Sequence, residues 1–89
     1  MRQNVINRLV DKCLDTKWKK GSNEKVAGIC PFCLYMFKGN LSCKGCPVFN
    51  LFVEKQRLCN YLRSIEEYVY QLSDKELNLI RNKLISLRI

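Results

Sequence analysis

Four cysteines in the middle of the chain form two pairs with the spacing of metal ligands. The pairs are Cys30-Pro31-Phe32-Cys33 and Cys43-Lys44-Gly45-Cys46, and together they give the pattern C-x2-C-x9-C-x2-C. Two residues between cysteines let both thiolates face one ion, and zinc takes four thiolates in a tetrahedron at about 2.3 Å. We therefore expect Cys30, Cys33, Cys43 and Cys46 to bind one structural zinc ion. Two disulfides, or buried thiols without a metal, are the alternatives.

Iron, as a single ion or as an iron–sulfur cluster, is the alternative metal. Cys46-Pro47 resembles the end of ferredoxin motifs, but the C-x2-C-x2-C run of those motifs is missing, which favours zinc. The Cys30–Cys33 pair also resembles a glutaredoxin active site. That family needs a βαβ frame and a later proline loop, which the rest of the sequence does not indicate, so a redox enzyme is not favoured.

Two further cysteines lie outside the pairs. Cys13 falls on the apolar stripe of a predicted helix, and we expect it to be a small core residue. Cys59 lies at the edge of another apolar stripe. Three roles remain open for it: a core residue, a ligand that replaces or joins one of the four, or a surface thiol.

The cysteine pattern resembles a group of small cysteine-rich proteins of prokaryotes and phages. The shared order is a helix ending near a tryptophan, then C-P-x-C, C-x-G-C-P-V, and a lone cysteine with a tyrosine soon after. The matching residues are Trp18, Cys30, Pro31, Cys33, Cys43, Gly45, Cys46, Pro47, Val48, Cys59 and Tyr61. The resemblance covers residues 13–61 and departs at Asn60, where the pattern has a proline. It implies a cysteine cluster and no particular activity.

The composition argues against catalysis. Histidine is absent, which excludes a Ser-His-Asp triad, a Cys-His dyad and every mixed cysteine–histidine metal site. The eight carboxylates form no recognisable acid–base pair. A closed four-thiolate zinc site also has no open position for water. We therefore expect a binding protein and not an enzyme.

The apolar periodicity predicts a mainly α-helical fold around the cysteine centre. Residues 3–19 have apolar side chains at spacings of three and four, and residues 48–72 and 74–88 continue that pattern. Ser73 and Glu76 match a capping box at the start of the last helix. Within the centre, residues 34–37 fit a helical turn or a short strand equally well. A chain of 89 residues has room for one core, so we expect a single domain over 1–89.

The charge favours an anionic partner. The net charge is +8, from 16 basic and eight acidic residues. The densest basic cluster lies at the end of the first predicted helix, and a further lysine lies between the second pair of cysteines. The candidate nucleic-acid contacts are Lys17, Trp18, Lys19, Lys20 and Lys44. Alternatively, Trp18 belongs to the core, and the helices over 48–72 and 73–89 bind a protein partner or a second copy of the chain.

No segment indicates export or membrane insertion. The first residues lack the apolar core of a signal peptide. The longest apolar run spans residues 29–37, too short for a bilayer, which needs about 20 residues in a helix. We therefore expect a cytoplasmic protein with no membrane partner. In such a reducing compartment, paired cysteines more often hold a metal than form disulfides.

Overall fold

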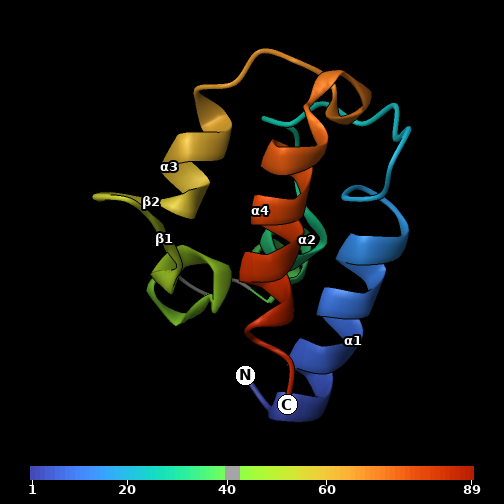
Figure 1. Ribbon diagram of the computed structural model, residues 1–89. Coiled ribbons are helices and arrows are strands. Elements are labelled where there is room, and N and C mark those ends of the chain that lie inside the picture. The colour runs from blue at the N-terminus through green and yellow to red at the C-terminus, as the bar shows by residue number, and fades with distance from the viewer. Residues whose placement is uncertain (40–42) are drawn as a thin grey trace.

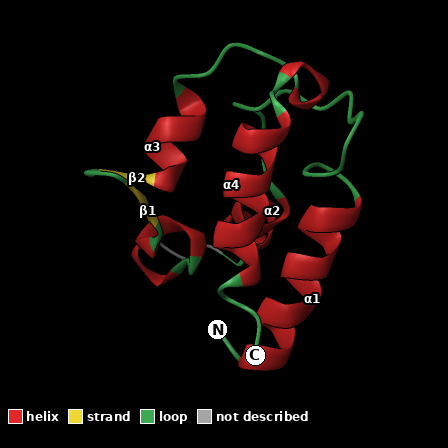
Figure 2. Ribbon diagram, in the orientation of Figure 1, coloured by secondary structure: helices red, strands yellow, loops and turns green. Residues whose placement is uncertain are grey.

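The computed structural model describes residues 1–39 and 43–89, with Cys43 described through its backbone. Its α-helices are α1 (Gln3–Asp15), α2 (Pro31–Lys38), α3 (Leu58–Arg63) and α4 (Asp74–Ile85), and the strands are β1 (Phe52–Val53) and β2 (Gln56–Arg57) (Figure 1). Short 3-10 turns lie at Cys43–Gly45, Val48–Asn50 and Val69–Gln71. The structure is 55% helical, which confirms the mainly α prediction, and Figure 2 shows how small the strand content is.

Helices α1 and α4 lie side by side, and the two ends of the chain meet at the foot of this pair (Figure 1). The Gln3 side-chain amide donates to the Leu87 carbonyl at 2.9 Å, and that of Asn7 donates to the Ile89 carbonyl at 3.0 Å. Helix α2 packs against α1. Helix α3 stands to the other side of α4 in this view.

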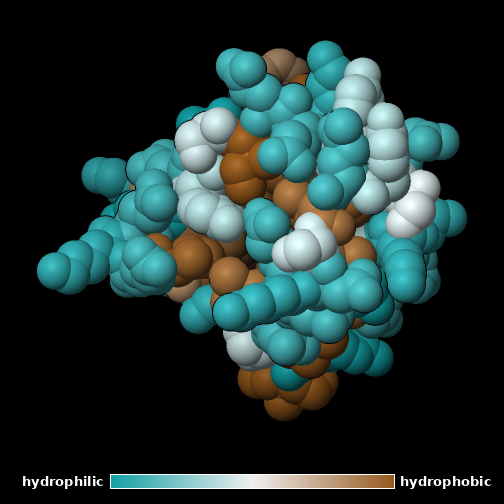
Figure 3. Space-filling view, turned by 45° about the horizontal axis from the view of Figure 1, so that its top comes forward, coloured by the Kyte–Doolittle hydropathy of each residue, from teal (hydrophilic) through white to brown (hydrophobic). Residues whose placement is uncertain are grey.

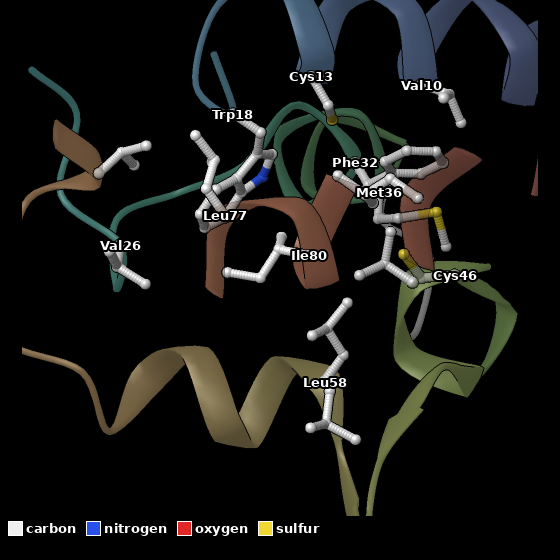
Figure 4. Packing of buried hydrophobic residues seen from close by; sticks show 14 residues of the cluster. Val10, Cys13, Trp18, Val26, Phe32, Met36, Cys46, Leu58, Leu77 and Ile80 are labelled. Atoms are coloured by element: carbon white, nitrogen blue, oxygen red, sulfur yellow. The ribbon is translucent and has the colours of Figure 1, made fainter. Parts of the chain in front are cut away.

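The core lies between these helices. Figure 4 shows Trp18 next to Leu77 of α4, and Phe32 next to Met36 of α2. Residues from every α-helix contribute to it, and the largest fully buried side chains are Trp18, Phe32, Leu58, Ile80, Val10, Val26 and Val69. Polar side chains cover most of the face in Figure 3, and apolar ones surface between them in small groups.

Helix α1 ends at Asp15, four residues before the predicted end at residue 19. The chain then turns: the Trp18 amide donates to the Cys13 carbonyl at 2.8 Å, and Gly21 takes a positive φ of 82° that glycine adopts without strain. This turn carries the Trp18 side chain into the core. Burial of the indole therefore outweighs the helical periodicity that continues to residue 19.

The carbonyls exposed by this early end are bound by Arg81 of α4. Its guanidinium donates to the Leu14 carbonyl at 3.1 Å and also to the Trp18 carbonyl. We predict that Arg81→Ala lowers the free energy of unfolding by about 1–3 kcal/mol, because half-buried carbonyls lose a charged donor. Denaturant unfolding measures this. Arg88→Ala is the matched control: its exposed ion pair with Asp11 should contribute at most about 1 kcal/mol. Equal losses in the two variants would contradict the capping role.

The predicted helix over 48–72 is wrong. After the 3-10 turn, Leu51 is extended, and β1 and β2 form an antiparallel hairpin in which Glu54 takes a positive φ of 58°. Only Leu58–Arg63 is α-helical, and a 3-10 turn follows at Val69–Gln71. The helical spacing of leucines marks one buried position, Leu58, and three half-buried ones, Leu51, Leu62 and Leu72. It does not determine the backbone that carries them.

Tertiary pairing explains why the helix stops. The amide of Val26 donates to the Glu67 carbonyl at 2.9 Å, and the amide of Val69 donates to the Glu24 carbonyl at 2.8 Å. The segment between α1 and α2 is thus hydrogen-bonded to the segment before α4, with Lys25 and Tyr68 as an isolated bridge. Tyr68 itself is extended, a backbone conformation that aromatic residues favour.

The start of α4 confirms the predicted cap. The Ser73 hydroxyl accepts from the Glu76 amide at 3.2 Å, and Glu76 and Asp74 lie in the first turn, where acidic side chains complement the helix dipole. The helix ends at Ile85, three residues before the predicted end at 88. Among the described residues, none of the helices is both long enough and apolar enough to cross a bilayer.

Candidate metal centre

The first cysteine pair lies at the start of α2. Cys30 is the N-cap residue, and its sulfur accepts from the Cys33 amide at 3.5 Å. Pro31 occupies the first helical turn, where its missing amide hydrogen costs nothing. The two sulfur atoms lie 3.6 Å apart. Four sulfurs at about 2.3 Å from one zinc ion are separated by about 3.8 Å, so this pair already has the separation of two zinc ligands.

The two thiols of this pair differ in acidity. The hydrogen bond between the Cys30 and Cys33 side chains lowers the pKa of Cys30, although burial opposes the change. The same hydrogen bond, together with burial, raises the pKa of Cys33. The pair therefore favours a thiolate on Cys30, and the thiolate is the form of cysteine that binds metal ions.

Hydrogen bonds from Asn50 hold the second cysteine loop in place. The Asn50 side-chain amide donates to the Lys44 carbonyl at 3.4 Å and to the Cys46 carbonyl at 3.3 Å. Cys46 is buried, and Figure 4 shows it facing Met36 of α2. The side chain of Cys43 lies outside the described residues, so its role as a ligand stays a prediction.

Two adjoining pockets connect the cysteines. One, of about 390 Å³, is lined by Ile29, Cys33, Leu34, Met36, Phe37, Cys46, Phe49, Cys59, Asn60 and Arg63. The other, of about 160 Å³, includes Cys30, Cys33, Cys59 and Arg63 in its lining. Cys33 and Cys59 line both. The fold thus brings the described cysteines Cys30, Cys33, Cys46 and Cys59 to one region, although Cys59 is distant in sequence.

The donors in this region suit a soft ion such as zinc. Thiolates are the ligands that structural zinc sites use, and neither pocket is lined by a carboxylate among the described residues. Within this described part, no three cysteine or acidic side chains are yet grouped closely enough to hold one ion. The other sulfurs would therefore have to approach the 3.6 Å pair for one ion to be held by all of them.

Cys13 lies in the core, as predicted. It is fully buried on α1, and burial raises the pKa of its thiol to about 12. A buried neutral thiol acts as a small apolar side chain.

The predicted nucleic-acid cluster is divided by the fold. Trp18 is 1% exposed and Lys17 is 3% exposed, so neither can contact an external ligand. The Lys17 ammonium donates to the Gly28 carbonyl and lies 5.0 Å from the centre of the Trp18 ring. Burial lowers the pKa of Lys17, while the nearby Cys30 opposes this. For these two residues, the prediction of nucleic-acid contact is wrong.

The remaining residues of that cluster are on the surface. Lys19, Lys20 and Lys44 are exposed. Lys20 also lies 3.9 Å from Asp74 in an exposed ion pair, which screens part of its charge. Three lysines of the predicted cluster thus remain available to a phosphate backbone. The aromatic residue of that cluster, Trp18, is not available for stacking on a base because it is buried.

Sequence reasoning missed an apolar surface beside the cysteines. Ile29 is 76% exposed, Leu34 41% and Phe37 81%, and all three line the larger pocket. We call these three residues the apolar rim. The signal was present in the apolar run over 29–37, because a short surface helix can bury only one of its faces.

No protein-family model, curated protein or solved structure matches the chain. Its function must therefore be inferred from its own residues and their geometry.

Proposed function

We propose that the protein is a non-catalytic binding module stabilised by a structural metal ion, zinc in preference to iron, on its paired cysteines. The observation that supports this most directly is the 3.6 Å separation of the Cys30 and Cys33 sulfurs at the start of α2. Bound zinc would supply folding free energy and no chemistry, because four thiolates leave no position for substrate. The set Cys30, Cys33, Cys43 and Cys46 is the one given by the sequence spacing.

We further propose that the partner is a protein that contacts the apolar rim. Exposed apolar side chains around a pocket are typical of protein-binding surfaces. Phe37 can serve as an anchor residue, since its ring is mostly exposed in the isolated chain. Burying three such side chains in a partner is favourable at roughly 25 cal/mol per Å².

The charge of the segment that carries the rim indicates the kind of partner. Residues 29–65 carry five basic side chains, Lys38, Lys44, Lys55, Arg57 and Arg63, against the single acidic side chain of Glu54. Four thiolates on one zinc ion would remove two of these positive charges and leave an excess. The proposed partner surface is therefore apolar where it meets the rim and acidic in net charge.

Nucleic acid is the second candidate, supported by the net charge of +8 and by the exposed Lys19, Lys20 and Lys44. A partner of this kind would be held by phosphate contacts. Affinity would then fall by roughly 0.9 log units per contact for each tenfold rise in salt on duplex DNA.

One pair of variants separates the two candidates. In affinity capture from cells that express the protein, Phe37→Glu should abolish recovery of a specific protein, because a charge would enter an apolar contact. For the purified pair, the loss should be at least about 30-fold in Kd, as for an anchor residue. The triple change Lys19→Ala, Lys20→Ala and Lys44→Ala should retain the protein partner.

The matched control is Tyr70→Glu, at another exposed aromatic residue outside the rim, which should bind like the wild type. If the triple lysine variant loses a salt-dependent nucleic-acid complex while Phe37→Glu keeps it, the protein-partner proposal is wrong and nucleic acid is the partner.

A further inference from the structure

Cys59 lies in the same region as the described cysteines of the proposed metal centre. It stands in the first turn of α3, half-buried, and lines both pockets together with Cys33. Cys46 lines the larger pocket, and Cys30 lines the smaller one. Among the cysteines that line the two pockets, Cys33 and Cys59 are thus the ones common to both.

The packing of α3 explains this placement. Helix α3 packs against the 3-10 turn Val48–Asn50 that directly follows the second cysteine loop. The Leu58 amide donates to the Leu51 carbonyl at 2.7 Å, which fixes where α3 begins. The hairpin between them therefore returns the chain to the cysteine centre, which the predicted continuous helix could not have done.

We propose that Cys59 is a ligand of the structural metal ion and completes a four-sulfur set with Cys30, Cys33 and Cys46. This rests on the proposed metal centre and refines its ligand set, in which the spacing alone assigns the fourth position to Cys43. The ion binds at the 3.6 Å pair. Cys46 and Cys59 line the larger pocket together with Cys33 and would approach the ion as it binds.

The charges around Cys59 suit an anionic centre. A zinc ion with four thiolates carries a net charge of −2. Arg63, one turn further along α3, lines both pockets. The same helix would thus supply one ligand and one compensating positive charge.

The test uses the full chain purified without added metal. Zinc content is measured by elemental analysis, and the number of sulfur ligands by X-ray absorption at the zinc edge. The wild type should hold one zinc with four sulfurs. Cys59→Ser should show three sulfurs and one lighter ligand. Its zinc affinity should fall by more than the about 10- to 100-fold that loss of an outer-sphere partner costs.

A second variant covers the case in which Cys59→Ser does not fold. Cys59→His restores a ligand and should fold with three sulfurs and one nitrogen around the zinc, whereas Cys13→Ala should keep four sulfurs. A wild type without metal would overturn the metal centre itself. A metal-bound wild type whose Cys59→Ser and Cys59→His variants both keep four sulfurs at wild-type affinity would overturn only the role of Cys59.

Discussion

Cys33→Ser is expected to abolish binding of the proposed metal ion and to unfold much of the chain. Structural zinc contributes on the order of 10 kcal/mol to the folding of small metal-binding peptides, and a hydroxyl is a poor replacement for a thiolate. Cys33 is 3.6 Å from Cys30 and lines both pockets. Its loss therefore removes a proposed ligand that lies beside Cys30 and lines a pocket with each of the other described cysteines of the site. Metal content and far-ultraviolet circular dichroism measure the two effects.

Treatment of the wild type with a strong chelator should reproduce this loss of helicity. Cys13→Ala is the control, because Cys13 is fully buried on α1 and should affect packing without changing the metal content. A metal-free protein that keeps its helical signal in chelator would show that packing alone maintains the fold, and the structural metal would have to be abandoned.

Trp18→Ala is expected to cost about 3–5 kcal/mol of folding stability, the range for truncating a large buried aromatic side chain. That is a large share of the about 5–15 kcal/mol by which a typical domain is stable. Trp18 packs beside Leu77 and Ile80 (Figure 4), and its ring also contacts the buried ammonium of Lys17. Denaturant unfolding gives the difference directly.

The control for Trp18 is Tyr70→Ala, because Tyr70 is 53% exposed and its loss should cost about 1 kcal/mol or less. If Trp18→Ala instead left stability unchanged and reduced binding to nucleic acid, the indole would have to be a surface residue, against its observed burial.

Local signals in the sequence predicted the parts of the fold that are determined locally. Ser73 and Glu76 located the start of α4, since a cap depends on a few neighbouring residues. The spacing of Cys30 and Cys33 predicted that their sulfurs would lie together, and a proline after Cys30 suits the helix start that brings them there. Cys13 was recognised as a core residue from the apolar stripe of α1.

The parts that sequence reasoning missed depend on distant contacts. The leucines of residues 48–72 have helical spacing, yet Leu58 and Val69 reach the core from a short helix and from a 3-10 turn. Lys17 was assigned to the surface because lysine is seldom buried. Its burial depends on the Gly28 carbonyl, a partner that no periodicity reveals. The position of Cys59 beside the other cysteines depends on the β1–β2 hairpin, which reverses the chain before α3. The sequence pattern did not predict this hairpin.

The pairing between residues 22–26 and 67–70 has a consequence for the order in which the chain can fold during synthesis. Both cysteine pairs and Cys59 lie inside the loop that this pairing closes. The Glu24 carbonyl cannot receive its hydrogen bond until Val69 has been made, whereas Cys30 and Cys33 are joined by a single helical turn. Because local contacts form before those that close long loops, a metal ion could be captured by the nascent chain first and would then shorten the loop that remains to be closed.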